Sequence, residues 1–471
     1  MLELSCFVAG EAISSSETLS VINPYNKEVV GIVTIANRTH VEAAIQSALS
    51  YRSTLTRYQR YDILMRVRQS LQARAEEFAQ LITAETGLAI REARYELGRC
   101  ADVLMFAAHE AMRDDGQTFS GDVSPIGKSR KIVTTREPHA LVVAITPFNH
   151  PMNQVLHKLA PAVAAGAPLI LKPSEKTPLC ALQLAQLFYE AGLPPQSLSV
   201  LLGRTEEVAT PLVQDSRVEV LAFTGSVSVG KTIAKTAGYK KLVLELGGND
   251  PLIVLEDADL DLAATLACEG SFRNSGQRCT AIKRILVQES VREEFTERMV
   301  ERAKTYLYGD PTDPATVVGT VIDEASAIRL EAVVQKAAAQ GAKVLLGGTR
   351  RGALLAPTVI ACVPRDADMI VQESFGPLAP ILGVRDLEDA VEFSNSSGYG
   401  LSAAIVTRDI GKAVWGVKNL RVGMVNINDV PSYRVESQPF GGVKDSGLGV
   451  KEGVIETMRY MTYVKTFSIP W

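Results

Sequence analysis

The sequence has little of what marks a metal centre, a disulfide scaffold or a zinc module. Its six cysteines form no C-x-x-C pair, and its five histidines form no H-E-x-x-H or similar spacing. Structural zinc sites and disulfide frameworks need clustered cysteine or histidine ligands. We therefore expect no metal and no disulfide framework, and any special cysteine is expected to be a reduced thiol.

Charge of one sign and long apolar runs are also scarce. The formal net charge is −4, and no block of like charges appears, so a nucleic-acid partner is not expected. No uncharged apolar run reaches the length that spans a bilayer. The first residues carry acids at Glu3 and Glu11 without a basic leader region. The sequence predicts a cytoplasmic protein without a membrane partner.

What is present is the composition of a globular protein and an alternating α/β pattern. With 471 residues, 46 % hydrophobic and 22 % charged, the chain has material for two or three domains. Segments 40–50, 58–87 and 91–116 predict helices by apolar residues at three and four spacing, and 119–138 predicts a long hairpin. Strands and helices then alternate from residue 140, and a second such run follows residue 245, which predicts two α/β units with parallel sheets.

The stretch FTGSVSVGKT fits the phosphate-loop pattern G-x-x-x-x-G-K-[ST] at Gly225, Gly230, Lys231 and Thr232. Val227 and Val229 resist the backward-wrapped backbone that such a loop needs, so the segment favours an ordinary helix with Ser226 as its N-cap. Of the pattern G-x-G-x-x-G only the outer glycines are present. On this stretch alone, a dinucleotide site, a triphosphate site and a structural turn all stay open.

Three other residues are candidates for chemistry. Cys279 follows a Ser-Gly-Gln turn beside Arg278, where a cation and free amides would favour a thiolate, although a lone cysteine is more commonly a small core residue. Glu245 ends an apolar strand before two glycines, which is typical of a base with a raised pKa or of a structural ion pair. Asn149 ends another strand, where its amide could donate to an oxyanion or form a turn.

Seven motifs together are far more specific than any one of them. TPFNHP, LKPSEKTP, FTGS, ELGGNDP, NSGQRCTAIKR, QESFGP and PFGGVKDSG occur in the order and spacing of the NAD(P)-dependent aldehyde dehydrogenase superfamily, which the chain resembles from about residue 20 to its end. The resemblance implies a Rossmann-type parallel-sheet cofactor domain (1–118 and 138–245) and an α/β catalytic domain (246–437). It also implies a small β extension for oligomerisation (119–137 and 454–471), and hence a homodimer or homotetramer.

The resemblance also implies roles for the candidate residues. Cys279 is expected to be the nucleophile, Asn149 the oxyanion donor, and Glu245 the base that activates the hydrolytic water. It makes FTGSVSVGKT a pyrophosphate turn and its agreement with the ATPase pattern accidental. The cofactor is expected to be NAD, since the Glu175 carboxylate would repel a 2′-phosphate. The expected cofactor contacts are Thr146, Pro147, Phe148, Lys172, Ser174, Glu175, Thr224, Gly225, Ser226, Gly230, Leu246, Glu373 and Phe375.

The substrate is expected to be a small anionic aldehyde. Arg99, His150, Arg278 and Arg434 would form a cationic mouth if they converge, although each alone is more commonly a surface or ion-paired residue. Within the superfamily the pattern is most similar to enzymes that oxidise phosphonoacetaldehyde to phosphonoacetate. Non-phosphorylating glyceraldehyde-3-phosphate, lactaldehyde and succinate semialdehyde enzymes are the near alternatives, and a non-catalytic dinucleotide- or ATP-binding protein is the alternative of another class.

Overall fold

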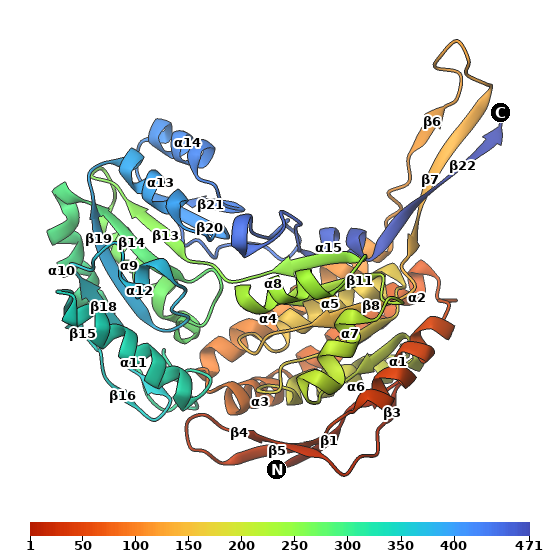
Figure 1. Ribbon diagram of the computed structural model, residues 1–471, viewed down its shortest axis with the longest axis horizontal. Helices are drawn as coiled ribbons and strands as arrows, with labels where there is room; N and C mark the ends of the chain where they lie inside the picture. The colour runs from red at the N-terminus through yellow and green to blue at the C-terminus, as the bar shows by residue number, and fades with distance from the viewer.

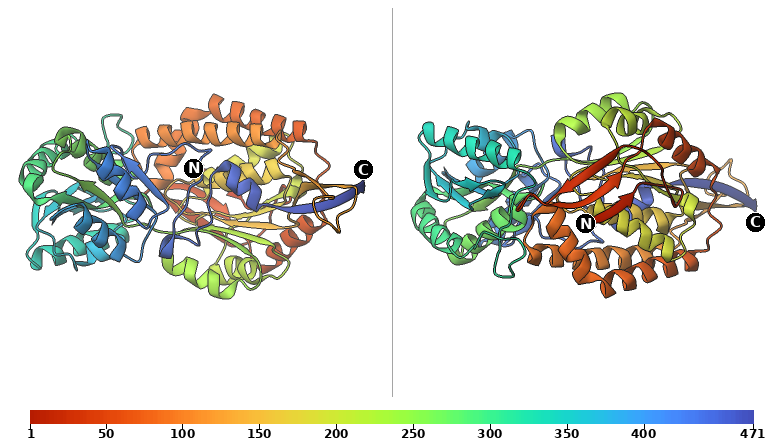
Figure 2. Two further views of the ribbon diagram at one scale, coloured as in Figure 1. Left: turned by 90° about the horizontal axis from the view of Figure 1, so that it is seen from above. Right: turned by 90° about the horizontal axis from the view of Figure 1, so that it is seen from below.

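The computed structural model describes residues 1–471. Two sheets, each covered by helices on both faces, form two lobes that lie end to end, and a β arm projects from the first lobe (Figures 1 and 2). The predicted α/β fold with two parallel sheets is therefore confirmed. None of the helices combines the length and the apolarity that crossing a membrane demands.

The first lobe contains the N-terminal half of the chain. Its strands are β1 (Leu2–Ser5), β2 (Phe7–Val8), β3 (Glu11–Ala12), β4 (Thr18–Ile22), β5 (Val29–Thr34), β8 (Val142–Ile145), β9 (Leu169–Lys172), β10 (Leu198–Val200), β11 (Val220–Thr224) and β12 (Lys241–Glu245). Its helices are α1 (Arg38–Ser50), α2 (Arg57–Ala73), α3 (Ala75–Thr86), α4 (Ile90–Ala111), α5 (Asn153–Ala165), α6 (Leu179–Glu190), α7 (Thr210–Gln214), α8 (Val227–Thr236) and, from the C-terminal part, α15 (Val454–Tyr460).

The large sheet of this lobe has the order β12-β11-β8-β9-β10-β2-β3, and its first five strands are parallel. In chain order the strands run outward from β8 through β9 to β10 and then return to β11 on the other side of β8. The strand order therefore reverses between β8 and β11. In open α/β sheets a ligand binds outside the carboxyl ends of the strands at such a switch point.

The second lobe is built in the same way. Its strands are β13 (Asp250–Val254), β14 (Ile282–Gln288), β15 (Lys343–Leu346), β16 (Arg350–Arg351), β17 (Leu354–Leu355), β18 (Thr358–Ala361), β19 (Leu378–Val384), β20 (Ser402–Val406) and β21 (Met424–Ile427). Its helices are α9 (Leu260–Phe272), α10 (Arg292–Ala303), α11 (Glu324–Ala339), α12 (Asp368–Val371), α13 (Leu387–Ser396) and α14 (Ile410–Asn419). The sheet order is β15-β18-β19-β14-β13-β20-β21.

The arm joins two distant parts of the chain. β6 (Thr118–Ser120) and β7 (Arg130–Pro138) form the predicted hairpin, and β22 (Thr462–Pro470) pairs with β7 along its whole length, antiparallel. The arm leaves the first lobe on the side away from the second lobe (Figure 2). Most side chains of β22 are exposed.

Two features differ from the segments that the sequence predicts. The helical segment 58–87 is two helices, α2 and α3, which meet at Arg74. The first 34 residues form five short strands, of which β1, β5 and β4 make a separate small sheet. The break at Arg74 is hard to predict because helix-forming residues continue on both sides of it. The short strands are hard to predict because they are too short to show a clear alternation of apolar and polar residues.

Candidate active site

The site lies where the two sheets meet. The chain passes from the carboxyl end of β12 to the start of β13 through only 246–249, so the carboxyl edge of the first sheet faces the amino edge of the second. A Cβ on Gly248 would lie 2.5 Å from the carbonyl oxygen of Cys279. The glycine therefore lets the crossing chain pass directly against the loop that carries the cysteine.

The cysteine loop is held in a strained turn. Asn274, Ser275 and Gly276 all have positive φ, between 53° and 68°, a region that is costly for residues other than glycine. The Lys283 ammonium donates to the carbonyl oxygens of Arg278 at 2.8 Å and Cys279 at 2.9 Å. These contacts fix the backbone around the thiol.

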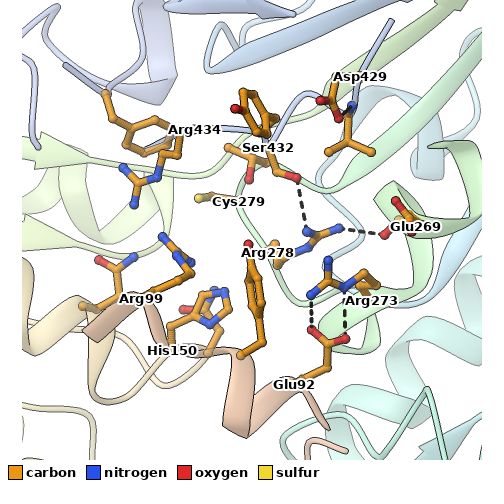
Figure 3. Close-up of a pocket in the computed structure, with 17 residues that line it drawn as sticks. Glu92, Arg99, His150, Glu269, Arg273, Arg278, Cys279, Asp429, Ser432 and Arg434 are labelled. Carbon is orange, nitrogen blue, oxygen red and sulfur yellow. Dashed lines mark hydrogen bonds and ion pairs between the residues drawn. The ribbon is translucent and has the colours of Figure 1, made fainter. Parts of the chain in front are cut away.

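A cavity of about 290 Å³ opens beside Cys279. Asn149 and all four cationic residues that the sequence predicts line it, so Arg99, His150, Arg278 and Arg434 converge around the thiol (Figure 3). The sequence reasoning missed the other lining residues: Glu92, Tyr95, Gln154, Glu269, Arg273, Thr280, Asp429, Val430, Ser432, Tyr433 and Phe440. Tyr95 had a usable signal, because it lies four residues before Arg99 on one helix face.

The arginines of the cavity differ in how their charge is compensated. Glu436 accepts a hydrogen bond from Arg99, lies 2.6 Å from His157 Nε2, and lies 3.8 Å from Arg434. Burial acts to raise the pKa of Glu436, but His157, Arg434 and Arg99 outweigh it and hold that pKa well below its usual range. One carboxylate is thus shared by two arginines and a histidine.

Arg278 has no carboxylate partner. Its guanidinium donates to the carbonyl oxygens of Glu269 at 3.0 Å and Gly270 at 2.9 Å and to Ser432 Oγ at 3.2 Å. Arg273, by contrast, binds the Glu92 carboxylate through two hydrogen bonds (Figure 3). Burial lowers the pKa of Arg278 to about 10, so Arg278 stays charged near neutral pH without a carboxylate in ion-pair distance.

The Cys279 thiol is not activated by its surroundings in this state. Burial raises its pKa to about 11, and the field of Lys283 offsets this only in part. The expected thiolate is therefore not favoured by these electrostatics. The reason is that desolvation, together with the fields of Glu373 and Asp250, outweighs the fields of Lys283 and Arg434.

Glu245 lies apart from this cavity. It ends β12, is 3 % exposed, and has no hydrogen-bond partner on either carboxylate oxygen. Burial and the nearby Glu452 raise its pKa well above the ordinary value. The raised pKa that the sequence predicts for Glu245 is found, whereas its role as base remains a prediction.

Most of the predicted cofactor residues gather at the carboxyl edge of the first sheet. Residues 146–148 follow β8, Lys172 to Glu175 end β9 and begin its loop, 224–226 end β11, and Leu246 follows β12. These loops surround the switch point between β8 and β11, where a dinucleotide is expected.

The turn after β11 is not a phosphate loop. Ser226 caps α8 by accepting from the Val229 amide, and Lys231 Nζ lies 2.7 Å from Asp445, so the prediction of an ordinary capped helix is confirmed. A Cβ on Gly230 would lie 2.3 Å from Leu246 Cδ2. Gly230 therefore lets α8 pack closely against Leu246, the residue that follows β12.

Side-chain contacts hold several of the predicted cofactor residues in place. Lys172 donates to the Glu175 carboxylate in the β9 loop. In the second lobe, Glu373 Oε1 accepts from the Gly248 amide at 3.2 Å and lies 3.2 Å from Lys283 Nζ. Phe375 contacts Phe148 edge to face, with ring centroids 5.9 Å apart, and so connects the two lobes.

Comparison with known proteins decides the family. The model of the aldehyde dehydrogenase family matches residues 12–467. The chain belongs to this family. It is 39 % identical over 457 residues to the 3-sulfolactaldehyde dehydrogenase of Priestia megaterium, covering 97 % of this chain and 96 % of the relative. It is 36 % identical over 470 residues to the lactaldehyde dehydrogenase of Methanococcus aeolicus, covering 98 % and 99 %.

Solved structures of the family match the whole fold. Glyceraldehyde-3-phosphate dehydrogenase GapN of Methanocaldococcus jannaschii, complexed with NADP, matches with a TM-score of 0.93 and 39 % identity over 98 % of this chain and all of that one. Aldehyde dehydrogenase 21 of Physcomitrella patens, with its product succinate, gives 0.95 and 35 % over 100 % and 98 %. An NAD-dependent aldehyde dehydrogenase of Sinorhizobium meliloti gives 0.94 and 33 % over 99 % and 95 %. This aldehyde dehydrogenase is an NAD(P)-dependent oxidoreductase.

Proposed function

We propose that this aldehyde dehydrogenase oxidises a short aldehyde with an anionic group, phosphonoacetaldehyde first, to the carboxylic acid with NAD. The observation that carries the proposal is that Arg278, a cation without a carboxylate partner, lines one cavity with Cys279. A phosphonate dianion would be compensated by Arg278 and by the surplus positive charge around Glu436.

Several relatives support a short anionic aldehyde, whereas others are named for uncharged lactaldehyde. Of the former, one is named for 3-sulfolactaldehyde, one structure for glyceraldehyde 3-phosphate, and another holds succinate. 3-Sulfolactaldehyde is the second candidate, because its enzyme is among the relatives with 39 % identity. A sulfonate is a monoanion, so the two candidates differ in the charge that the arginines must compensate.

The chemistry would begin at the thiol. Cys279 would give its proton to a water molecule, and its sulfur would bond to the carbonyl carbon while the carbonyl π electrons move to oxygen. The Asn149 side-chain amide, which already donates to the Gln277 carbonyl oxygen at 2.8 Å, has a second hydrogen for that oxyanion. Bound NAD supplies the hydride acceptor, and the carbon is left as a Cys279 thioester.

Hydrolysis would free the enzyme. A water oxygen bonds to the thioester carbon, the carbon–sulfur bond breaks, and the acid leaves. Glu245 would take the proton of this water, as its raised pKa suits a base near neutral pH. Since Glu245 does not line the Cys279 cavity, this step requires its side chain or a chain of waters to reach the thioester.

The residues present fit a dinucleotide. Buried Thr146 Oγ1 has no partner within the chain, and the first amides of α8 lie at the switch point, as anion sites do. Lys172 and Glu175 would meet the adenosine ribose, and Glu373 the second ribose. We propose NAD rather than NADP because the Glu175 carboxylate would lie beside the 2′ position.

The arm supports a homo-oligomer. Phe119, Val464, Phe467, Ile469 and Trp471 are all exposed large hydrophobic residues on or beside its strands. We propose that the extension predicted as 119–137 and 454–471 packs on a second copy through its arm strands, since α15 lies in the first lobe. Residues 1–118 with 138–245 would bind cofactor, and 246–437 would supply the cysteine.

The test is reduced-nicotinamide absorbance with purified protein and NAD. Phosphonoacetaldehyde, 3-sulfolactaldehyde, glyceraldehyde 3-phosphate, lactaldehyde and succinate semialdehyde are compared by kcat/KM. Phosphonoacetaldehyde is expected to give the highest value, and the anionic aldehydes are expected to exceed lactaldehyde. A preference for lactaldehyde would contradict the proposal. An ATP-hydrolysis assay, expected to be negative, tests the alternative that the protein is a nucleotide-binding protein and not a dehydrogenase.

A further inference from the structure

A buried carboxylate on α4 lies beside His150, in the turn before α5. Glu96, on α4, is 1 % exposed, and its Oε2 lies 3.5 Å from His150 Nδ1. Both atoms are buried, and neither makes a hydrogen bond of normal geometry. The 3.5 Å ion-pair contact therefore leaves each free to pair with the other.

The other oxygen of Glu96 fixes the backbone beside His150. Glu96 Oε1 accepts from the amides of Met152 and Asn153, both at 2.9 Å. These amides begin α5, whose N-cap residue makes no side-chain hydrogen bond. Glu96 thus supplies the missing cap from 56 residues away in the chain, and it holds the turn that carries Asn149 and His150.

The second ring nitrogen of His150 is free for a ligand. Nδ1 is buried. Nε2 is not among the buried atoms that lack a partner, and it makes no hydrogen bond within the chain, so it is open to the cavity. His150 lines the Cys279 cavity. With Nδ1–H directed at Glu96, neutral His150 presents the Nε2 lone pair to the cavity, and only protonation turns Nε2 into a donor.

We propose that Glu96 is a positioning residue that fixes His150 in the Nδ1–H tautomer, and that the pair takes up one proton when an anionic group binds. This inference rests on the proposed anionic substrate. Without the proton, the lone pair of Nε2 would repel the anion. With the proton, Nε2–H donates to it, and Glu96 balances the new positive charge.

The groups around His150 set the pH range of this uptake. Burial lowers the pKa of His150, Glu96 opposes that shift, and the fields of Arg99 from α4 and Arg278 from the cysteine loop add to it. Cys100, next to Glu96, has a pKa raised by burial and stays neutral. The free enzyme therefore holds neutral His150 near pH 7, and a bound anion raises its pKa.

The first test uses ethanesulfonate, a monoanion that does not titrate, as a competitor of the aldehyde. In the wild type its inhibition constant is expected to rise about tenfold per pH unit between the free and bound pKa values of His150, since one proton is coupled to binding. Glu96→Gln replaces the oxygen facing Nδ1 with an amide donor. His150 then keeps its proton on Nε2, and the inhibition constant is expected to be flat from pH 6 to 8.

A control variant weakens the capping of another helix without touching His150. Glu85, on α3, accepts from two amides at the start of α6, from Leu179 through Oε2 at 2.9 Å and from Cys180 through Oε1 at 3.1 Å. Glu85→Gln is expected to keep the wild-type slope. If Glu96 has only a structural role, Glu96→Gln changes the inhibition constant by the same factor at every pH and keeps the wild-type dependence on pH. That result would overturn the proposal.

The second test does not depend on the substrate. ¹⁵N spectra of histidine-labelled protein, assigned with His150→Asn, report which ring nitrogen carries the proton. The proton is expected on Nδ1 in the wild type and on Nε2 in Glu96→Gln, and ethanesulfonate is expected to raise the pKa of His150 only in the wild type. The Nε2–H tautomer in the wild type would overturn the positioning role. If ethanesulfonate does not bind, the anionic substrate and the proton uptake both fail, while the tautomer still decides whether Glu96 positions His150.

Discussion

Arg278 offers the sharpest test of an anion-binding cavity. Its charge has no carboxylate partner, and its hydrogen bonds go to two carbonyl oxygens and Ser432 Oγ. Arg278→Ala removes a charge-assisted hydrogen bond to the substrate, which contributes about 1.5–3 kcal/mol. KM for an anionic aldehyde is therefore expected to rise about 10- to 150-fold, because about 1.4 kcal/mol corresponds to a factor of ten.

The assay compares phosphonoacetaldehyde with propanal, which carries no charge. Both are followed by reduced-nicotinamide absorbance in the wild type and in Arg278→Ala, Arg278→Lys and Ser432→Ala. Arg278→Lys keeps the charge but loses the planar fork, so its KM is expected to lie between those of the wild type and Arg278→Ala. Ser432→Ala removes a hydrogen-bond partner of Arg278 but leaves the charge of Arg278 in place, so it is expected to raise KM less than Arg278→Ala does.

The comparison of the two aldehydes decides between binding and structure. If Arg278 binds the anionic group, KM for propanal changes little in Arg278→Ala. If KM rises by the same factor for both aldehydes, Arg278 only supports the loop of Cys279, and the reasoning is refuted.

Three further predictions concern other parts of the molecule. Glu245→Gln is expected to keep a first burst of reduced nicotinamide while steady turnover falls at least about 100-fold, the scale of general-base catalysis; an unchanged steady rate in a stopped-flow trace would argue against a base at Glu245. Glu175→Ala is expected to lower KM for NADP more than for NAD, and equal changes in a two-cofactor titration would contradict the ribose contact. Burial raises the pKa of Glu85 from 4.5 to about 7, so the folded state holds a proton that the unfolded chain releases between these values. The wild type therefore loses stability as pH rises through this window. The unfolding free energy of Glu85→Gln, relative to that of the wild type, is expected to increase by up to about 3 kcal/mol from pH 4.5 to pH 8. If urea titrations give the same difference in unfolding free energy between the two proteins at every pH, Glu85 does not titrate in this range.

The large features of the fold followed from periodicity and from residue order. Alternating strands and helices predicted the two parallel sheets, because buried parallel strands read as short apolar runs between amphipathic helices. The β-branched residues in FTGSVSVGKT correctly favoured a capped helix, and the structure places Lys231 on Asp445.

The contacts that set the charge of the cavity could not be predicted from the sequence. Arg99 and Glu436 lie 337 residues apart in the chain, and no local pattern marks such a pair. The sequence therefore predicted which cations to suspect, but it could not show that Arg278 alone lacks a carboxylate. Burial was equally hidden, and for this reason the raised pKa of Cys279 reversed the expected thiolate.

The central claim is that Cys279 bonds covalently to an anionic aldehyde during turnover. Mass spectrometry of Glu245→Gln, quenched after mixing with NAD and phosphonoacetaldehyde, tests it directly. Four cysteines are buried and Cys362 is exposed, so Cys362 serves as an internal control for non-specific reaction. The account predicts an acyl adduct on the peptide that contains Cys279, formed only with both NAD and aldehyde present. An adduct on Cys362 alone, or none on Cys279 while reduced nicotinamide is produced, would contradict it.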